Sequence, residues 1–291
     1  MAQGSFLFWV RRHPFLLIIL LLVLLDIVLI CGLFVREHPV LRVSFLDVGQ
    51  GDAVLIEAPN GNQLLYDAGP PSGAALRALS REMSFLDRSI DVVVLSHPDA
   101  DHIGGFPEIF KRYRVGAVIE PHVSSATGVY DATEKAIENE RSAHFVAKRG
   151  MQIELGDGVV LDILYPDADL PGADTNSASV VMLLHYGATA FLLSGDLPQK
   201  EEEQIARAFG ERLHAQVLKL GHHGSRTSTS PYWLAAIDPE TVIISAGLNN
   251  RYGHPHKEVL ELLEKISIPY LTTFKEGTVS YESDGETVSR D

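Results

Sequence analysis

Hydrophobic residues fall along this chain in two different patterns, a single long run near the start and many short runs from residue 41 onward. Residues 15 to 35 are apolar except for Asp26, and about twenty such residues span the hydrocarbon core of a bilayer. The run predicts a transmembrane anchor, with residues 1–14 as a short tail and residues 36–40 as a linker. Asp26 in mid-span predicts either a contact with a partner helix in the membrane or a tolerated lone polar residue.

Charges beside the long run give an expected orientation. Arg11 and Arg12 precede it, while Arg36 and Arg42 follow it, and a short, positively charged N-terminus favours the cytoplasmic side. The run lacks a small-residue cleavage site, which favours an uncleaved anchor over a signal peptide. We therefore expect a single-pass membrane protein whose main domain, residues 41–291, lies outside the cytoplasm.

From residue 41 onward the short apolar runs predict an α/β (α+β) domain. Runs rich in β-branched residues predict strands, and two short hairpins come first, with Asn60 and Gly61 as a turn. Helical patterns then interleave with further strands, which indicates mixed sheets covered by helices. The expected strands are 41–48, 53–57, 63–66, 92–95, 116–120, 151–155, 158–164, 180–185, 191–193, 217–220, 243–246, 269–273 and 277–282, and the expected helices are 74–84, 105–113, 130–149 and 258–265.

One apolar run, residues 92–95, ends in a dense group of potential metal ligands, His97, Asp99, Asp101 and His102. Two imidazoles and two carboxylates within six residues would repel one another or lack partners without a cation, and such nitrogen and oxygen ligands suit zinc, manganese or iron. A helix cap needs only one aspartate. A calcium loop would need a bidentate glutamate where Phe110 stands. The pattern therefore predicts a metal loop at a strand end.

Other strand ends and turns carry polar residues of the same kind. An apolar run leads to Asp196, another to His222 and His223, and a glycine turn near the start holds Asp52. Each of them also fits ordinary turn or helix-cap chemistry. Residues 224–230, rich in serine and threonine, suit phosphate oxygens or form a plain loop. His254 lies between a glycine and a proline, as expected of a positioned proton donor.

These motifs together resemble a known family. The loop of residues 97–102 is similar to the His-x-His-x-Asp-His signature of the metallo-β-lactamase superfamily, with Asp99 in place of the second histidine. Residues 45–53, 218–225 and 249–256 sharpen the resemblance to the C-terminal hydrolase domain of ComEC-type competence proteins. Asn176 stands where many superfamily members have a third histidine ligand, and an amide is a weak ligand. The resemblance implies that Asp67 has a structural role.

The resemblance also implies a fold and a site. The fold is a four-layer αββα sandwich, and the cofactor is two divalent metal ions, zinc or manganese. The implied metal ligands are His97, Asp99, Asp101, His102, Asp196 and one of the two adjacent histidines, with His222 preferred and His223 left to face the substrate. The implied catalytic residues are Asp101, His223 and His254, and the implied substrate-binding residues are Asp52, Asn176, Ser179, Ser225 and Asn250.

The overall charge sets a limit on the expected function. The chain has a formal net charge of −14, and residues 41–291 carry 36 acidic and 21 basic residues. A nuclease usually presents a basic track, and the nearest basic cluster in the sequence is residues 111–114. We expect a membrane-anchored metal-dependent hydrolase of phosphodiesters, with single-stranded DNA as a candidate substrate. The alternatives are a hydrolase of small or cell-surface phosphoesters such as phosphocholine, and a non-catalytic module in DNA uptake or envelope assembly.

Overall fold

The structure is a computed structural model that describes residues 12–34, 40–167 and 174–291. The chain separates into two units, Met1–Pro39 and Val40–Asp291. Each unit is described by itself.

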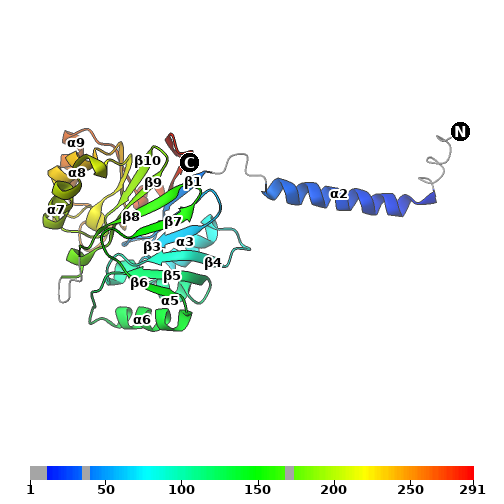
Figure 1. The fold of residues 1–291 in the computed structure, drawn as a ribbon, viewed down its shortest axis with the longest axis horizontal. Coiled ribbons are helices and arrows are strands. Elements are labelled where there is room, and N and C mark those ends of the chain that lie inside the picture. Colours follow the sequence, from blue (N-terminus) through cyan, green and yellow to red (C-terminus); the bar gives the residue numbers. More distant parts are fainter. Residues whose placement is uncertain (1–11, 35–39, 168–173) are drawn as a thin grey trace. The chain divides into compact units, whose positions relative to one another are not determined.

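Helix α2 (Pro14–Phe34) makes up most of the first unit (Figure 1). Its side chains are described as far as Val28, and nearly all of those are exposed. In the portion of the chain that the structure describes, no helix meets the length and hydropathy that a membrane crossing requires. The transmembrane anchor expected over residues 15–35 is thus not supported by the structure.

The second unit contains two mixed sheets. In the first sheet, β1 to β3 pair antiparallel and β3 to β6 pair parallel. The chain's last two strands complete this sheet beside β1. Its order is β15 (Val288–Arg290), β14 (Val279–Ser283), β1 (Leu41–Phe45), β2 (Val54–Glu57), β3 (Gln63–Tyr66), β4 (Ser89–Val94), β5 (Arg114–Glu120), β6 (Ala143–Val146).

The second sheet repeats this plan. Strands β7 to β10 pair antiparallel, and β10 to β13 pair parallel. Its order is β13 (Tyr270–Thr272), β12 (Thr241–Ile244), β11 (Val217–Lys219), β10 (Thr189–Leu193), β9 (Val181–Tyr186), β8 (Val159–Tyr165), β7 (Gln152–Gly156).

Among the residues that the structure describes, buried apolar side chains form three cores, and these define four layers (Figure 1). The central core joins the inner faces of the two sheets, and each outer core lies between one sheet and its helices. Burial of apolar surface on both faces of each sheet explains why the strands read as nearly continuous apolar runs. The predicted αββα sandwich is confirmed. The helices are α3 (Ala74–Glu82), α4 (Ala100–Ile103), α5 (Phe106–Ile109) and α6 (Gly128–Glu140) on the first sheet, α7 (Gln199–Phe209), α8 (Pro231–Ile237) and α9 (Lys257–Lys265) on the second, and the short α10 (Thr273–Glu276) after β13.

Two hydrogen bonds join the sheets next to the loops that follow the parallel strands. Tyr66 Oη donates to the carbonyl of Val180 at 2.7 Å, and the backbone N–H of Val180 donates to the carbonyl of Ser96 at 2.8 Å. The segment just before β9 is therefore fixed against the carboxyl ends of β3 and β4. This end of the sandwich is where polar residues from both sheets meet.

The structure differs from the predicted elements in the helix expected over residues 130–149 and in the unexpected helix α8. The helix expected over residues 130–149 ends at Glu140, where Arg141 has a left-handed φ of 55°, and residues 143–146 form β6. β6 is an exposed edge strand, so its sequence lacks the buried alternation that marks a strand. Helix α8 was not expected, although Ser230 accepts the N–H of Trp233 and Pro231 begins the helix.

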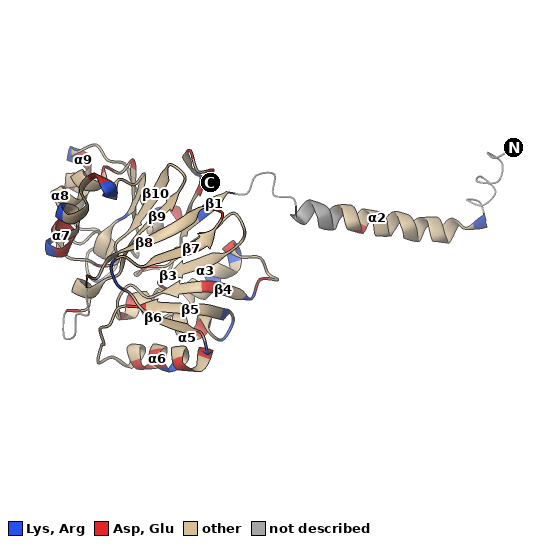
Figure 2. Cartoon of the chain, viewed as in Figure 1, with Lys and Arg blue, Asp and Glu red and all other residues tan. Residues whose placement is uncertain are grey.

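Charged residues gather on helices such as α6 and α7, and most strands carry few (Figure 2).

Candidate metal centre

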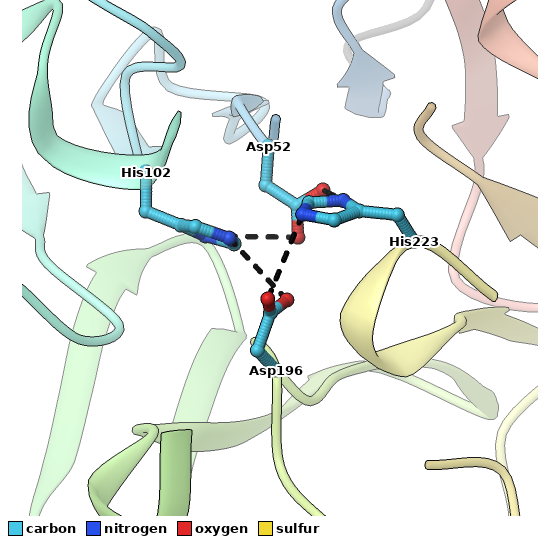
Figure 3. Close-up of side chains that lie close together, drawn as sticks. All are labelled: Asp52, His102, Asp196 and His223. Atoms are coloured by element: carbon cyan, nitrogen blue, oxygen red, sulfur yellow. Dashed lines mark hydrogen bonds and ion pairs between the residues drawn. The ribbon is translucent and has the colours of Figure 1, made fainter. Parts of the chain in front are cut away.

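A buried cluster of two aspartates and two histidines lies where strands of the two sheets end. One ligand atom from each of Asp52, His102, Asp196 and His223 lies within 4.8 Å of the others, and all four residues are buried (Figure 3). Asp52 precedes β2 and His102 lies on α4 after β4, so both belong to the first sheet. Asp196 follows β10 and His223 follows β11 in the second sheet. The cluster therefore depends on the packing of the sandwich.

Asp67 and Ser96 orient His102. Asp67 follows β3, is fully buried, and places Oδ2 2.8 Å from His102 Nδ1. The Ser96 backbone N–H and hydroxyl both donate to the Asp67 carboxylate at 2.7 Å. This carboxylate fixes the ring so that Nε2 points toward Asp196 Oδ1, 3.3 Å away. A carboxylate behind an imidazole is the usual outer partner of a metal-bound histidine.

His97 has the same kind of arrangement. Its ring is fully buried, and Nδ1 lies 2.9 Å from Ser96 Oγ. Its Nε2 atom lies 3.8 Å from Asp99 Oδ2 and 3.9 Å from Asp196 Oδ2. The His97 and His102 rings are 4.1 Å apart between centroids. The Nε2 atom of His97 therefore faces Asp196 Oδ2, whereas the Nε2 atom of His102 faces Asp196 Oδ1.

Asp52 orients His223 in turn. The Nδ1 atom of His223 lies 3.1 Å from Asp52 Oδ1 and 2.9 Å from the Ser245 carbonyl oxygen. Its Nε2 atom lies 3.3 Å from Asp101 Oδ2 and 3.6 Å from Asp196 Oδ2. The second Asp52 oxygen accepts a hydrogen bond from Lys219 Nζ at 2.5 Å. Both oxygens of Asp52 are thus engaged, so it serves to position His223 and not to face an ion.

The backbone around Asp196 and His223 is held in a fixed, partly strained form. Ser179 Oγ accepts the backbone N–H of Asp196 at 3.1 Å. His222 and His223 have φ values of 49° and 54°, in the left-handed region that side chains other than glycine seldom adopt. Glu202 accepts the N–H groups of Thr229 and Ser230 at 2.7 Å and holds the loop that follows. Non-glycine residues in this conformation are common at functional sites.

The unpaired atoms of the cluster fit a metal. Among the described residues, the buried side-chain atoms without a hydrogen-bond partner include the Nε2 atoms of His97, His102 and His223 and the Oδ1 atom of Asp196. An unsatisfied buried polar atom costs about 1–3 kcal/mol, so four that face one another call for a common partner. Imidazole nitrogens and carboxylate oxygens suit zinc, manganese or iron. The cluster therefore fits one or more divalent ions.

The electrostatics of the cluster also favour a cation. Burial opposes ionisation of Asp196, but the charges of His223, His102 and His97 outweigh it and lower its pKa well below the usual range. Burial likewise opposes protonation of His223, but Asp196 and Asp52 outweigh it and raise its pKa to about 10. Burial, then the charge of His102, lowers the pKa of His97 to about 4. The carboxylates that hold a proton on His223 would equally hold a metal ion, so proton and metal compete.

Three predicted ligands lie at the open rim of the cluster. The side chains of Asp99, Asp101 and His222 are 38%, 28% and 26% exposed. His222 Nε2 lies 3.6 Å from Asp196 Oδ2, and its Nδ1 lies 3.2 Å from Thr227 Oγ1. The structure thus brings all six predicted ligands to one place, with His222 at the surface and His223 beneath it.

The loop after β12 carries His254 over the rim. The His254 ring centroid lies 5.2 Å from that of His222 and 6.0 Å from that of His223. Asn250 shapes this loop, because its Oδ1 accepts the N–H groups of Tyr252 and His254. Burial and the charges of His222, His223 and His256 lower the pKa of His254 to about 4.

The remaining predicted substrate-binding residues fall into two groups. Asp52 and Ser179 are buried and position other site residues, as described above. Ser225 is also buried, and its hydroxyl pairs with Thr227 Oγ1 at 2.9 Å. Asn176 begins a short 3-10 helix, and its Oδ1 has no hydrogen-bond partner.

Sequence reasoning did not single out Lys219. This lysine ends β11 and is fully buried, with Nζ bonded to Asp52 and to the carbonyl of Leu220 at 2.9 Å. The sequence did carry a signal for Lys219, because it lies among apolar residues in a predicted buried strand. A buried lysine is rarely found without a partner, so this position could have indicated a site residue.

A two-sheet αββα sandwich with a buried histidine–aspartate cluster at its strand ends defines a metallo-β-lactamase type of domain. The sequence model of the Metallo-beta-lactamase superfamily matches residues 46–248. The chain belongs to this superfamily.

Named relatives include competence and recombination proteins. The chain is 33% identical over 259 residues to ComE operon protein 3 of Bacillus subtilis and 34% identical over 239 residues to competence protein ComA of Neisseria gonorrhoeae. It is 35% identical over 246 residues to recombination protein 2 of Haemophilus influenzae. These matches cover 82%, 82% and 84% of the chain, which spans only 33%, 32% and 29% of those proteins. The predicted resemblance to ComEC-type proteins is confirmed.

Solved structures share the fold at low sequence identity. YhfI of Bacillus subtilis, a metallo-beta-lactamase fold protein, superposes with a TM-score of 0.56 at 11% identity, covering 84% of this chain and all of that one. CmlA of Streptomyces venezuelae, a diiron beta-hydroxylase, superposes with a TM-score of 0.53 at 13% identity, covering 87% of this chain and 54% of that one. These likenesses extend to the fold alone.

Proposed function

We propose that this domain is a metal-dependent phosphodiesterase that acts on single-stranded DNA. The observation that carries the proposal is the convergence of three unpaired imidazole nitrogens and one unpaired carboxylate oxygen beneath a rim of partly exposed carboxylates. Solvent reaches such a site at its rim, where Asp99, Asp101 and His222 are partly exposed, as a hydrolytic centre requires.

The residues around Asp196 would hold the ions. His102 lies beside Asp196 Oδ1, whereas His97, His222 and His223 lie beside Asp196 Oδ2. Asp99 lies beside His97, and Asp101 lies beside His223. Together these side chains would hold a pair of divalent ions. Divalent ions in such a pair lower the pKa of a bound water and offset charge that builds on phosphorus. The three carboxylates make manganese as good a candidate as zinc.

The chain's own residues supply the remaining chemistry. Asp67, Ser96 and Asp52 keep the imidazoles oriented, so little reorganisation is needed during reaction. Asn176, with an unpaired amide oxygen, would orient substrate. His254 would transfer a proton to the departing oxygen, since a phosphate beside the ring favours the imidazolium form.

The names of the relatives support DNA as the substrate. They are competence and recombination proteins, although the chain spans about a third of each. The net charge of the domain argues against long-range attraction of DNA. Within an uptake system, a neighbouring part of the machinery would deliver the strand.

Metal analysis with a substrate panel tests this function. The purified full-length chain, with manganese or zinc, should cleave single-stranded DNA, and Asp196→Asn should lose both bound metal and cleavage. Asp47→Asn, an exposed aspartate in a turn near the site, is the matched control and should retain both. Turnover of phosphocholine esters without DNA cleavage would favour the small-ester hydrolase. Absence of metal and of all turnover would favour the non-catalytic module.

We propose separately that residues 15–35 attach the domain to a membrane, with residues 41–291 outside the cytoplasm. The apolar composition of this run supports the proposal. Asp26 would contact a partner helix. The full-length chain should stay with membranes after an alkaline wash, and added external protease should digest the domain in spheroplasts. Release by the wash would overturn the proposal.

A further inference from the structure

A second hollow opens beside the metal centre and extends the site. This side cleft has a volume of about 400 Å³, and Pro70 and Pro71 line it together with Arg251 and Tyr252. It shares Gln50, Asp101 and Tyr252 with the smaller cavity over the metal ligands. A substrate bound at the ligands would therefore extend into the side cleft without leaving the protein surface.

Tyr252 presents an aromatic ring in the side cleft. The side chain is 48% exposed, and its ring lies parallel to that of His254, at 21° and 5.7 Å between centroids. The Arg251 guanidinium lies 4.7 Å from the ring centroid, and its Nη2 atom bonds the Tyr252 hydroxyl. A cation–π contact on an exposed ring is weaker than the stacking of a nucleobase on it. A base can therefore take the place of the guanidinium on this ring.

Arg251 supplies positive charge where the site lacks it. It is the one lysine or arginine among the described residues that line the side cleft and the cavity over the ligands. Those residues also include Asp99, Asp101 and Asp196. A guanidinium binds phosphate oxygens in a fork and remains charged at any relevant pH. Arg251 thus fits a phosphate next to the one that reacts.

The backbone holds Tyr252 in place before any ligand binds. Asn250 Oδ1 accepts the N–H of Tyr252 at 3.1 Å and that of His254 at 3.0 Å. Asn250 Nδ2 donates to the carbonyls of Gly247 at 2.9 Å and His254 at 2.6 Å. A preorganised ring loses little freedom on binding, which increases what stacking contributes.

We propose that the side cleft binds the nucleoside next to the scissile phosphate, with its base stacked on Tyr252 and the following phosphate bound by Arg251. The proposal rests on the proposed function, because it names the substrate of the same site. Bases within a duplex are already stacked on their neighbours, so the side cleft selects single strands. It reads no base sequence, since every base has a face to stack.

Two phosphodiesters that share a leaving group test the base contact. The p-nitrophenyl ester of thymidine 5′-phosphate carries a base, and methyl p-nitrophenyl phosphate carries none. With the manganese-loaded full-length chain, Tyr252→Ala should raise KM for the thymidine ester at least about fivefold and leave the methyl ester within twofold. Tyr252→Phe should retain most of the affinity. An equal effect of Tyr252→Ala on both esters, or on neither, would overturn the proposal.

An equilibrium measurement separates this proposal from the proposed function. Fluorescent oligothymidylate should bind the full-length chain more tightly than an abasic strand of equal length, and Tyr252→Ala should abolish the difference. Arg251→Gln should weaken both strands and flatten the salt dependence of binding. If no ester is hydrolysed but the difference in affinity between the two strands remains, the hydrolase proposal is wrong and the side-cleft proposal is supported. If the chain cleaves DNA but binds both strands equally, only the side-cleft proposal is wrong.

The chain offers a matched control pair. Arg207 lies 6.0 Å from the ring centroid of Tyr232, which is 49% exposed on α8 and does not line the side cleft. Tyr232→Ala and Arg207→Gln remove an exposed ring and a cation of the same kind. Neither should change the KM for either ester or the affinity for either strand.

Discussion

Lys219 Nζ lies 2.5 Å from Asp52 Oδ2, and neither side chain is exposed. This ion pair joins the end of β11 in one sheet to the turn before β2 in the other. Asp52 in turn bonds His223, so the lysine acts on the metal centre through two successive contacts. Burial opposes ionisation of Asp52, but Lys219 and His223 outweigh it and lower its pKa.

Lys219→Met should destabilise the domain strongly. The change leaves Asp52 as a buried carboxylate without its main partner, and breaking such a pair costs about 3–5 kcal/mol. Urea unfolding followed by the fluorescence of Trp233, which is buried, measures the loss. The double variant Lys219→Met with Asp52→Asn should recover part of it, because the carboxylate that lost its partner is then no longer charged.

Lys257→Met is the control for this prediction. Lys257 is exposed and pairs with Glu261 one helical turn away, so its removal should leave the free energy of unfolding nearly unchanged. Equal stability of the Lys219 and Lys257 variants would contradict the structural role given to the buried pair.

Asp67→Asn should weaken metal binding without unfolding the chain. Asp67 has a φ of 60°, which asparagine tolerates better than other side chains, so the backbone is kept. The amide cannot hold the Nδ1 proton of His102 as a carboxylate does, and loss of such a partner lowers metal affinity about 10–100-fold. Competition with a chelator measures the affinity. Asp47→Asn is the control and should keep the metal affinity of the parent chain. An unchanged metal affinity in the Asp67 variant would show that Asp67 does not support the metal ligands.

The sandwich was predictable because its buried strands are recognisable in the sequence. Buried parallel strands read as apolar runs, and the polar residues that end them, such as His97 and Asp196, mark the edge where a site forms. The exposed edge strand β6 lacks that pattern and was read as part of a helix. Fold and site location thus follow from local sequence wherever burial imposes a pattern.

The internal arrangement of the site did not follow in the same way. His222 and His223 are adjacent in sequence, and only the left-handed backbone at both residues decides which ring is buried. Lys219 is a site residue only because β11 and the turn before β2 meet across two sheets, which is a tertiary contact. Relations of this kind depend on packing, and no spacing in the sequence encodes them.

The stability of the domain should fall as the pH rises from 5.5 to 8, partly through Glu120 and Glu134. Burial raises the pKa of Glu120 to about 7, and burial with the charge of Glu120 raises that of Glu134 to about 7, from an ordinary value of 4.5. A carboxyl with a higher pKa in the folded chain takes up a proton on folding. Its contribution to the free energy of unfolding is complete below pH 4.5 and is lost as the pH rises through 7.

Glu134→Gln should reduce this pH dependence. Urea unfolding midpoints at pH 5.5 and pH 8 should differ less in the variant than in the parent chain, because one of the two carboxyls no longer ionises. Glu264→Gln, an exposed glutamate on helix α9, should leave the difference as it was. A midpoint difference that Glu134→Gln fails to reduce would show that the pair is not the source.

His254→Ala should slow hydrolysis according to how much the leaving group needs a proton. Its ring lies over the rim, 5.2 Å from that of His222, where a departing oxygen would emerge. An alkoxide leaves poorly without protonation, and general acid catalysis contributes about 100-fold or more, whereas p-nitrophenolate leaves unaided. We therefore expect kcat for a dinucleotide to fall about 100-fold and kcat for a p-nitrophenyl ester to change little. His185→Gln, on β9, serves as the control. Equal losses for both substrates would assign His254 to positioning the substrate or the ligands, since a proton donor acts on the leaving group alone.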